Sequence, residues 1–562
     1  MSAADPPGRR ARGRALALGV GAVLAFVVLF WRLGAPTFWD PDEAHYAETS
    51  REMIATGDYW TPRYNGQPFF DKPALFHQLQ AAAMRGVGPS ELGARLVPAM
   101  AALALIGVTW WFGSAVASPH VGLVAALLLT ISPGLFALAR YAILDTLFTL
   151  FTSGGAALLA AAVLRDRPRL QWAGYIAIAL GVATKGPVAL VLCGLTFLLT
   201  MAVSKELRPK LLALRWIAGL AIVAAVASPW FILMYVRYGR QFIDGYVLNE
   251  NVRLFAGNLY ANQPGVWFYF QILTTGLLPW TGLVVGRLVD DVRALRRGER
   301  LDALEILLWT WTASVVGFFT ASTFKLDHYV FPVAPALCLL CARAWVDMWH
   351  EEFASRHAGA RAGGHLVGPL LVMMGIGCGY FLVARLDLPR AAIVVPIAIA
   401  GCGVALTTFA NLRARLRLRP PIVPWFGLVA LGVTYAGLLL YVIPALEQRK
   451  VVPDVARFVA RQAPPGDGRV ASFRLNRWTP ALRFYVDRPM EFLDDAAEAE
   501  AFLQRPEPFY IVMRRGAFDE FVARGLPLTI AYERDGMWAT SGRALWRRRE
   551  TPTQFVVVAR RQ

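Results

Sequence analysis

The 562-residue chain has little charge and almost no cysteine. Only 17% of its residues are charged, whereas 56% are hydrophobic, and its mean hydropathy is +0.44. A soluble multidomain protein of this length carries more charge and less apolar sequence. The composition therefore excludes an ordinary soluble protein and indicates a polytopic membrane protein.

The chain also lacks the motifs of nucleotide binding and of cysteine-ligated metal sites. It has neither a Walker motif nor a dinucleotide-binding glycine motif, and no internal repeat. The five cysteines lie in apolar segments without metal-ligand spacing, which is typical of small core residues; they are Cys193, Cys338, Cys341, Cys378 and Cys402. The sequence therefore gives no sign that an activated substrate is bound through a nucleotide-binding motif of either kind.

The formal net charge of +18 could suggest a nucleic-acid partner, but the positions of the basic residues exclude one. They fall in alternate loops between apolar segments, which is the positive-inside pattern and marks those loops as cytoplasmic. The basic clusters are Arg9 to Arg14, Arg165 to Arg169, Lys205 to Arg215, Arg293 to Arg300 and Arg413 to Arg419.

Apolar windows long enough to cross a bilayer recur along the chain to residue 443. Since one crossing needs roughly 20 apolar residues, we expect about 13 transmembrane helices. They lie near 15–34, 92–116, 120–137, 145–164, 171–184, 187–203, 215–236, 265–286, 305–322, 329–345, 366–384, 391–410 and 422–443.

Two domains follow from this pattern. Residues 1–443 form an all-α polytopic membrane domain, with extracytoplasmic loops at 35–91 and 237–264. Residues 444–562 are less hydropathic and contain the short apolar stretches "RVASF", "ALRFYV", "FYIVM" and "TQFVVVARR". We expect them to form a soluble α/β or α+β domain on the extracytoplasmic side.

Three carboxylates gather just after the first apolar run, in "FWDPDEAHYAE": Asp40, Asp42 and Glu43. A helix is expected to begin at Asp42 and to end at Thr56-Gly57. Acidic residues in a first turn often only cap the helix. Their clustering beside a membrane segment favours a functional role as well.

Isolated charges recur at the same predicted side of the membrane. Charged groups embedded in apolar sequence are costly and are usually functional, although snorkelling or a private ion pair explains some of them. They are Asp145, Lys185, Lys325, Asp327 and His328. A polyprenyl phosphate carrying a sugar would reach such a site through the membrane, and lysines are good phosphate binders.

Five motifs carry a family resemblance. The segments "WDPDEAHYAETSREM", "GDYWTPRYNGQPFFDKP", "RYAILDTLFTLF", "TKGP" and "KLDHYVFPVAPAL" occur in this order. In this order and topology the chain resembles the bacterial aminoarabinose transferases and the wider group of GT-C lipid-linked sugar transferases. It departs from them at His45, where they often carry arginine, and at "DKPA", where they often carry an acidic-Lys-Pro-Pro run.

The resemblance implies an inverting transfer of 4-amino-4-deoxy-L-arabinose from undecaprenyl phosphate to a lipid A phosphate. The reaction would occur at the periplasmic face of the bacterial inner membrane. Transfer of another sugar to lipid A, a polysaccharide or a protein is the alternative, and a lipid transporter or flippase is a rival of another class.

Residues and resemblance together predict the site. The expected catalytic group is Asp42, Glu43 and Asp145. The expected donor-binding group is Lys72, Arg140, Tyr46, Lys185, Lys325, His328 and Tyr329. No cofactor is expected to be required, because lysines can neutralise a monophosphate; a divalent metal at Asp40 and Asp71 is an alternative.

Overall fold

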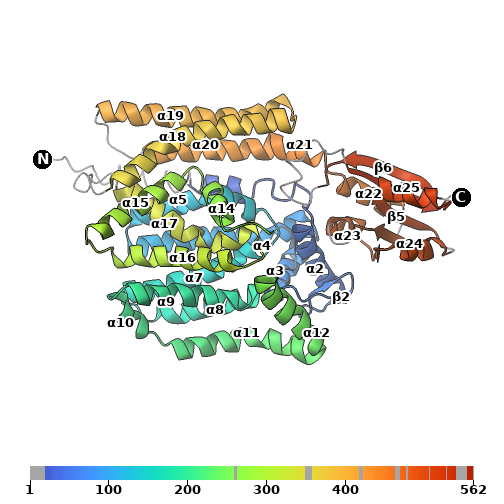
Figure 1. The fold of residues 1–562 in the computed structure, drawn as a ribbon, viewed down its shortest axis with the longest axis horizontal. Coiled ribbons are helices and arrows are strands. Elements are labelled where there is room, and N and C mark those ends of the chain that lie inside the picture. Colours follow the sequence, from blue (N-terminus) through green and yellow to red (C-terminus); the bar gives the residue numbers. More distant parts are fainter. Residues whose placement is uncertain are drawn as a thin grey trace.

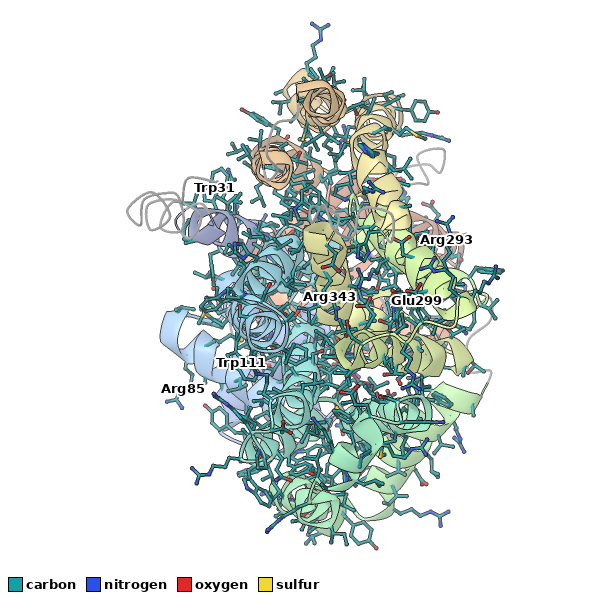
Figure 2. The ribbon with its side chains drawn as sticks, turned by 90° about the vertical axis from the view of Figure 1, so that its left-hand side faces the viewer. Trp31, Arg85, Trp111, Arg293, Glu299 and Arg343 are labelled. Atoms are coloured by element: carbon teal, nitrogen blue, oxygen red, sulfur yellow. The ribbon has the colours of Figure 1, made fainter. Side chains whose placement is uncertain are left out.

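The computed structural model describes residues 19, 21–257, 263–347, 357–416, 422–462, 469–475, 479–505, 507–526, 528–538 and 553–560. Long helices run side by side and form the larger part of the molecule, and the C-terminal sheet lies at one end of them (Figure 1). Figure 2 looks along this bundle from the opposite end, where Arg293, Glu299 and Arg343 are labelled. The chain is therefore a helical bundle with a mixed α/β region at one end.

The bundle contains helices long and apolar enough to cross a membrane. Among the described residues there are eight, or up to ten if each of two bent pairs counts as one span. The eight are Glu91–Val116 (α4), Asp145–Leu164 (α7), Trp216–Tyr238 (α11), Ala303–Ala321 (α16), Asp327–Asp347 (η2 and α17), Ala358–Arg385 (α18 and η4), Arg390–Thr408 (η5 and the start of α19) and Val429–Glu447 (the end of α20, η6 and α21). This makes the chain a multi-pass integral membrane protein.

The expected count of about 13 spans is higher than the described helices show. Helices α8 (Leu170–Lys185) and α9 (Val188–Val203) have 16 residues each, too few for a straight crossing. The first expected span, 15–34, lies partly outside the described residues.

The segment near 265–286 is not one helix either. It consists of α14 (Phe268–Gly276) and α15 (Thr281–Arg296), which meet at 117° around Pro279. Proline has no backbone N–H and interrupts a helix. The other bent pair, α5 (Pro119–Thr130) and α6 (Pro133–Ala139), turns by 61° in the same way before Pro133.

A small extramembrane layer lies between the bundle and the C-terminal region. It contains α2 (Asp42–Thr56), the two-residue strands β1 (Arg63–Tyr64) and β2 (Gln67–Pro68), and α3 (Leu75–Val87). The expected helix from Asp42 to Thr56 is confirmed, and Gly57 ends it with a φ of 71°. Glycine adopts this left-handed conformation without steric cost.

The expected loop at 237–264 is largely helical where it is described. It contains α12 (Arg240–Phe242), the π-helical segment η1 (Ile243–Arg253) and α13 (Leu254–Ala256). The aromatic side chains of Phe242 and Tyr246 are buried against Trp230 of α11. Tyr260, a further aromatic residue of this stretch, lies outside the described residues.

The C-terminal region is built around one mixed five-stranded sheet in the order β4-β3-β5-β7-β6. Strand β3 runs parallel to β4 and β5, whereas β7 is antiparallel to β5 and β6. The strands are β3 (Arg469–Phe473), β4 (Glu491–Leu493), β5 (Phe509–Arg514), β6 (Leu528–Gly536) and β7 (Thr553–Arg560), and the helices are α22 (Val452–Gln462), α23 (Pro480–Val486), α24 (Ala496–Leu503) and α25 (Arg515–Ala523).

One expected strand is a helix. The stretch "ALRFYV" forms α23, which begins at Pro480 and packs between α2 and α22. A proline suits the first turn of a helix, and a short apolar run does not by itself distinguish a strand from a buried helix. The other three quoted stretches are confirmed as strands.

The C-terminal region shares a hydrophobic core with α2. Ala44 and Ala47 of α2 are in one buried cluster with Val455, Leu482 and Phe484. Three hydrogen bonds reinforce this core. The Asp40 carboxylate accepts a hydrogen bond from the Ala481 backbone N–H at 2.7 Å, and further links run through the Tyr485 hydroxyl. Helix α2 is thus held from the membrane side and from the C-terminal side.

Candidate functional site

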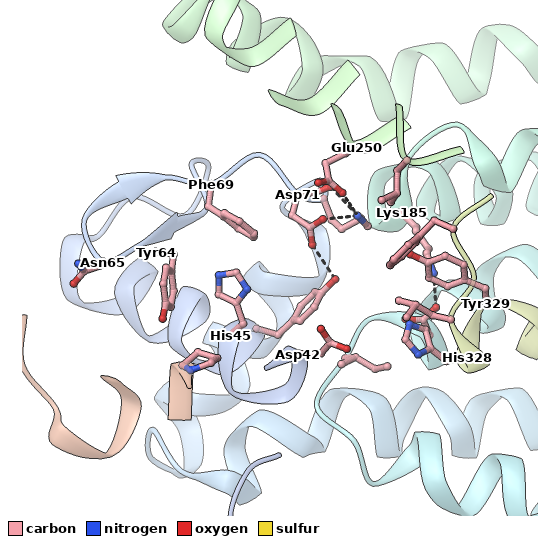
Figure 3. Close-up of a pocket in the computed structure, with 18 of the residues that line it drawn as sticks. Asp42, His45, Tyr64, Asn65, Phe69, Asp71, Lys185, Glu250, His328 and Tyr329 are labelled. Carbon is pink, nitrogen blue, oxygen red and sulfur yellow. Dashed lines mark hydrogen bonds and ion pairs between the residues drawn. The ribbon is translucent and has the colours of Figure 1, made fainter. Parts of the chain in front are cut away.

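A cavity of about 570 Å³ opens where these parts meet. Its walls come from the start of α2, the β1–β2 hairpin and the loop after it, the start of α7, the end of α8, η1, η2 and two positions of the C-terminal region. Figure 3 shows charged side chains on one side of Asp42 and mostly aromatic ones on the other. We call these the charged end and the aromatic end.

Asp42 lies between the two ends and is the first residue of α2. No hydrogen bond or salt bridge to its carboxylate occurs among the described residues. Burial raises the pKa of Asp42; nearby His328 opposes this rise, and Asp71 and Asp145 add to it. A carboxylate without a protein partner and with a raised pKa is suited to accept a proton.

The position of Glu43 differs from the one expected of a catalytic residue. Its side chain is fully buried and accepts hydrogen bonds from Arg95 at 2.6 and 2.9 Å. The backbone N–H groups of Trp39 and Ala142 also donate to it, each at 3.0 Å. Because Glu43 does not line the cavity, we assign it to holding the start of α2 against α4.

Asp145, Lys185 and His328 meet at the charged end, as expected. The Lys185 ammonium donates a hydrogen bond to Asp145, and His328 Nε2 lies 3.6 Å from the other Asp145 oxygen. Lys185 Nζ also lies 4.2 Å from the centroid of the Tyr329 ring. Three helical elements, α7, α8 and η2, therefore bring these separate charges into one cluster.

Lys72 lines the same cavity and contacts two carboxyl groups. Its Nζ lies 2.6 Å from Asp71 Oδ1 and 3.2 Å from Glu250 Oε2. Burial by itself lowers the pKa of Lys72, but Asp71 and Glu250 outweigh it and raise the pKa well above its usual value. Lys72 is thus a fixed cation. Tyr46 completes the group, because its hydroxyl donates to Asp71 at 3.3 Å.

Glu250 was not expected from the sequence. It comes from η1, in the stretch 237–264 that was expected to be an extracytoplasmic loop, and it lines the cavity. The sequence signal that could have identified Glu250 was an acidic residue among the polar and aromatic residues of that stretch. Contact with Lys72 could be seen only once both segments were placed.

Two expected donor-binding residues do not line the cavity. The Arg140 guanidinium donates to the carbonyl oxygens of Val28 and Trp31 at 3.2 and 2.9 Å. The Lys325 ammonium donates to the carbonyl oxygen of Ser322. Both cations stabilise local backbone, and the expectation that they contact the donor phosphate directly is therefore corrected.

The two candidate metal ligands do not come together around the cavity. Asp40 is committed to Ala481, while Asp71 is held by Lys72 and Tyr46. Within the described ranges, no group of three or more His, Cys, Asp or Glu side chains could hold a metal ion. The described residues thus give a metal no ready-made site, and no step below depends on one.

Fold and cavity define a multi-pass membrane protein with a buried, charge-lined pocket at one end of its bundle. Residues 20–240 match the family model described as dolichyl-phosphate-mannose-protein mannosyltransferase. Within this range, which is less than half of the chain, the protein is similar to that family of lipid-linked glycosyltransferases.

Curated relatives are similar over a longer part of the chain. The undecaprenyl phosphate-alpha-4-amino-4-deoxy-L-arabinose arabinosyl transferase 1 of Sodalis glossinidius is 28% identical over 62% of each chain. The protein of the same name from Pseudomonas fluorescens is 27% identical over 77% of this chain and 74% of its own. The chain spans about 60% of the length of several curated relatives that it matches.

Solved structures show the same fold. The crystal structure of ArnT from Cupriavidus metallidurans bound to undecaprenyl phosphate has a TM-score of 0.72 at 23% identity, and covers 97% of both chains. Its apo state gives a TM-score of 0.73 at 22% identity, with 98% of both chains covered.

Proposed function

We propose that this protein transfers a sugar from a polyprenyl phosphate carrier to an acceptor, with Asp42 at the reaction centre. The observation that carries the proposal is the position of the Asp42 carboxylate. It has no protein partner among the described residues, and it lines the same cavity as the ammonium groups of Lys72 and Lys185. A base beside fixed cations suits a reaction that releases a phosphate.

We place the path of the carrier lipid beside the main cavity. A smaller cavity of about 110 Å³ shares Lys72, Lys185 and Tyr329 with the main one. Its other walls include the apolar side chains of Val188 and Phe318. We place the donor phosphate at the two lysines and the first isoprene units between these apolar side chains. Fixed cations there stabilise the charge that develops on the leaving phosphate.

The reaction is a single displacement at the anomeric carbon. The acceptor oxygen forms a bond to that carbon as the bond to the phosphate oxygen breaks, and polyprenyl phosphate leaves with the bonding electrons. When the acceptor is a hydroxyl, its proton passes to Asp42. When the acceptor is a phosphate, it is already ionised, and Asp42 orients the sugar. Attack opposite the leaving group inverts the anomeric centre.

The specific reaction we propose is transfer of 4-amino-4-deoxy-L-arabinose from undecaprenyl phosphate to a lipid A phosphate. The names of the relatives, which specify that sugar and that carrier, support it. We place the reaction at the periplasmic face of the bacterial inner membrane. In support, α10 (Leu207–Leu212), which lies in the basic cluster from Lys205 to Arg215, is at the end of the bundle away from α2 (Figure 1).

The test is transfer by the purified protein in lipid, with synthetic undecaprenyl-phosphate aminoarabinose and lipid A. Mass spectrometry should show the addition of one pentosamine to lipid A. Asp42→Asn should lower the rate by about 10²- to 10⁴-fold, the usual contribution of a general base or a positioned catalytic group. Asp58→Asn is the matched control, because Asp58 is an acidic residue of the same extramembrane layer that does not line the cavity.

Different results would separate the alternatives. Transfer only from another lipid-linked sugar, or only to a polysaccharide or protein, would keep the reaction and replace the substrates. Movement of the intact donor across the membrane without sugar transfer would instead support a transporter. Full activity of Asp42→Asn would remove Asp42 from the mechanism.

A further inference from the structure

The aromatic end of the cavity has no role in the donor chemistry described above. Its walls include the rings of His45, Tyr64, Phe69 and Phe492, together with Pro480. Phe492 and Pro480 belong to the C-terminal region, so that region forms part of the cavity wall. Figure 3 shows His45, Tyr64 and Phe69 on the side of Asp42 away from Lys185 and His328.

The rings form a connected aromatic wall. The His45 ring centroid lies 4.3 Å from those of both Tyr64 and Phe69. Tyr64 also stacks on Phe492, with a centroid distance of 6.1 Å and an interplanar angle of 16°. Flat apolar faces with a few polar edges are characteristic of sites for small organic ligands.

This wall is fixed from two sides. The turn between β1 and β2 consists of Asn65 and Gly66, whose backbone N–H groups donate to the Glu52 carboxylate at 2.6 and 2.9 Å. The Asn65 side chain donates to the Met490 carbonyl oxygen at 3.0 Å. Helix α2 and the segment just before β4 thus hold the hairpin that carries Tyr64. A rigid wall loses little entropy when a ligand binds.

None of the described residues that line the aromatic end carries a formal charge. Burial lowers the pKa of His45 to about 4, so its imidazole is neutral near pH 7. Its Nε2 atom is buried and has no hydrogen-bond partner among the described residues. The exposed amide side chain of Gln67 is a further polar group at the edge. Such a surface suits an uncharged group with apolar faces and hydroxyl edges, which is the chemistry of a sugar ring.

The geometry of the displacement reaction indicates whether a sugar ring at the aromatic end belongs to the donor or to the acceptor. The donor phosphate is proposed at Lys72 and Lys185, and an inverting acceptor must approach from the side opposite the leaving group. The aromatic end lies on that opposite side of Asp42 (Figure 3). We infer that the aromatic end is a saccharide subsite for the sugar ring of the acceptor, and that the C-terminal region supplies part of it through Phe492. This inference rests on the proposed function.

The test compares two phenylalanine substitutions in the same C-terminal region. Phe492→Ala removes a ring of the cavity wall, whereas Phe458→Ala removes a ring that stacks on Tyr532 and does not line the cavity. With lipid A as acceptor, Phe492→Ala and Tyr64→Ala should each raise the acceptor KM about three- to tenfold, the usual effect of one aromatic contact. The donor KM should stay unchanged. Phe458→Ala should change neither value.

A binding measurement covers the case in which lipid A is not modified. The probe is the deacylated diglucosamine bisphosphate of lipid A, observed by saturation-transfer NMR with the full-length protein. Binding to the wild type that is weakened by Phe492→Leu, but not by Phe458→Leu, supports the subsite even if no sugar is transferred.

The outcomes for the two proposals can be told apart. Sugar transfer with equal acceptor KM values in Phe492→Ala, Tyr64→Ala and Phe458→Ala would overturn the subsite and leave the proposed reaction intact. Probe binding without transfer would overturn the lipid A reaction and keep the subsite. Absence of both would overturn both.

Discussion

The ammonium of Lys72 lies between two carboxyl groups, 2.6 Å from that of Asp71 and 3.2 Å from that of Glu250. This arrangement holds a cation at the charged end of the cavity in the absence of a substrate. We expect Lys72→Met to raise the donor KM about 10- to 100-fold, because a charge-assisted contact to phosphate is lost. Initial rates at varied donor concentration measure this effect.

The control for this prediction is Lys325→Met. Lys325 was expected to bind the donor from its sequence context, but it is bonded to Ser322 and does not line the cavity. The donor KM of the Lys325→Met variant should remain that of the wild type. An equal increase in both variants would show that the lysines act through something other than direct phosphate contact.

We expect donor binding to depend on pH through the titration of Glu250. Burial raises the pKa of Glu250 to about 8, a rise that Lys72 opposes. Below this pH the side chain is protonated and neutral; above it, a second carboxylate faces Lys72 and repels the donor phosphate. The donor KM should therefore rise above about pH 8 in the wild type. Glu250→Gln should abolish that rise, and a rise that persists in this variant would refute the role of Glu250.

Substitution within the buried pair of Glu43 and Arg95 should lower the stability of the protein without directly affecting the transfer reaction. Arg95→Met leaves the Glu43 carboxylate buried without its ion pair, which typically costs 3–5 kcal/mol. The midpoint of thermal unfolding in detergent should fall clearly below that of the wild type. Asp42→Asn should not lower it, because Asp42 has no salt bridge within the described part of the chain. Equal destabilisation by both substitutions would contradict the distinct positions of the two residues.

We expect that position 186, next to Lys185, requires a glycine because it has no room for a Cβ atom. Its φ is +92°, and an added Cβ would lie 2.2 Å from the Tyr246 hydroxyl oxygen. Gly186→Ala should therefore displace both the end of α8 and η1, and should lower kcat/KM. The double variant Gly186→Ala with Tyr246→Phe removes the hydroxyl and should restore part of the activity. Gly194→Ala is the control, because a Cβ there has no atom within 4 Å.

Local sequence determined the features that depend on local chemistry. Charge and hydropathy were enough to predict a multi-pass membrane protein with a C-terminal α/β region. Helix α2 could be predicted because an acidic first turn and a final Thr-Gly mark both of its ends. Asp145, Lys185 and His328 could be selected because charge within apolar sequence is costly and is seldom kept without a role. Asp42 was selected from its cluster of carboxylates, and Lys72 as a phosphate-binding lysine that the family resemblance also indicates.

Only the tertiary structure decided how those charges are used. Asp42 and Glu43 are adjacent in sequence, yet the turn of α2 points Asp42 into the cavity and buries Glu43 against Arg95. Glu250 and Phe492 reach the same cavity from distant segments. Sequence patterns record which residues are costly to bury, whereas their partners depend on how separate helices pack. Among the residues that the structure describes, that packing left Asp42 without a protein partner, whereas Glu43 is paired with Arg95.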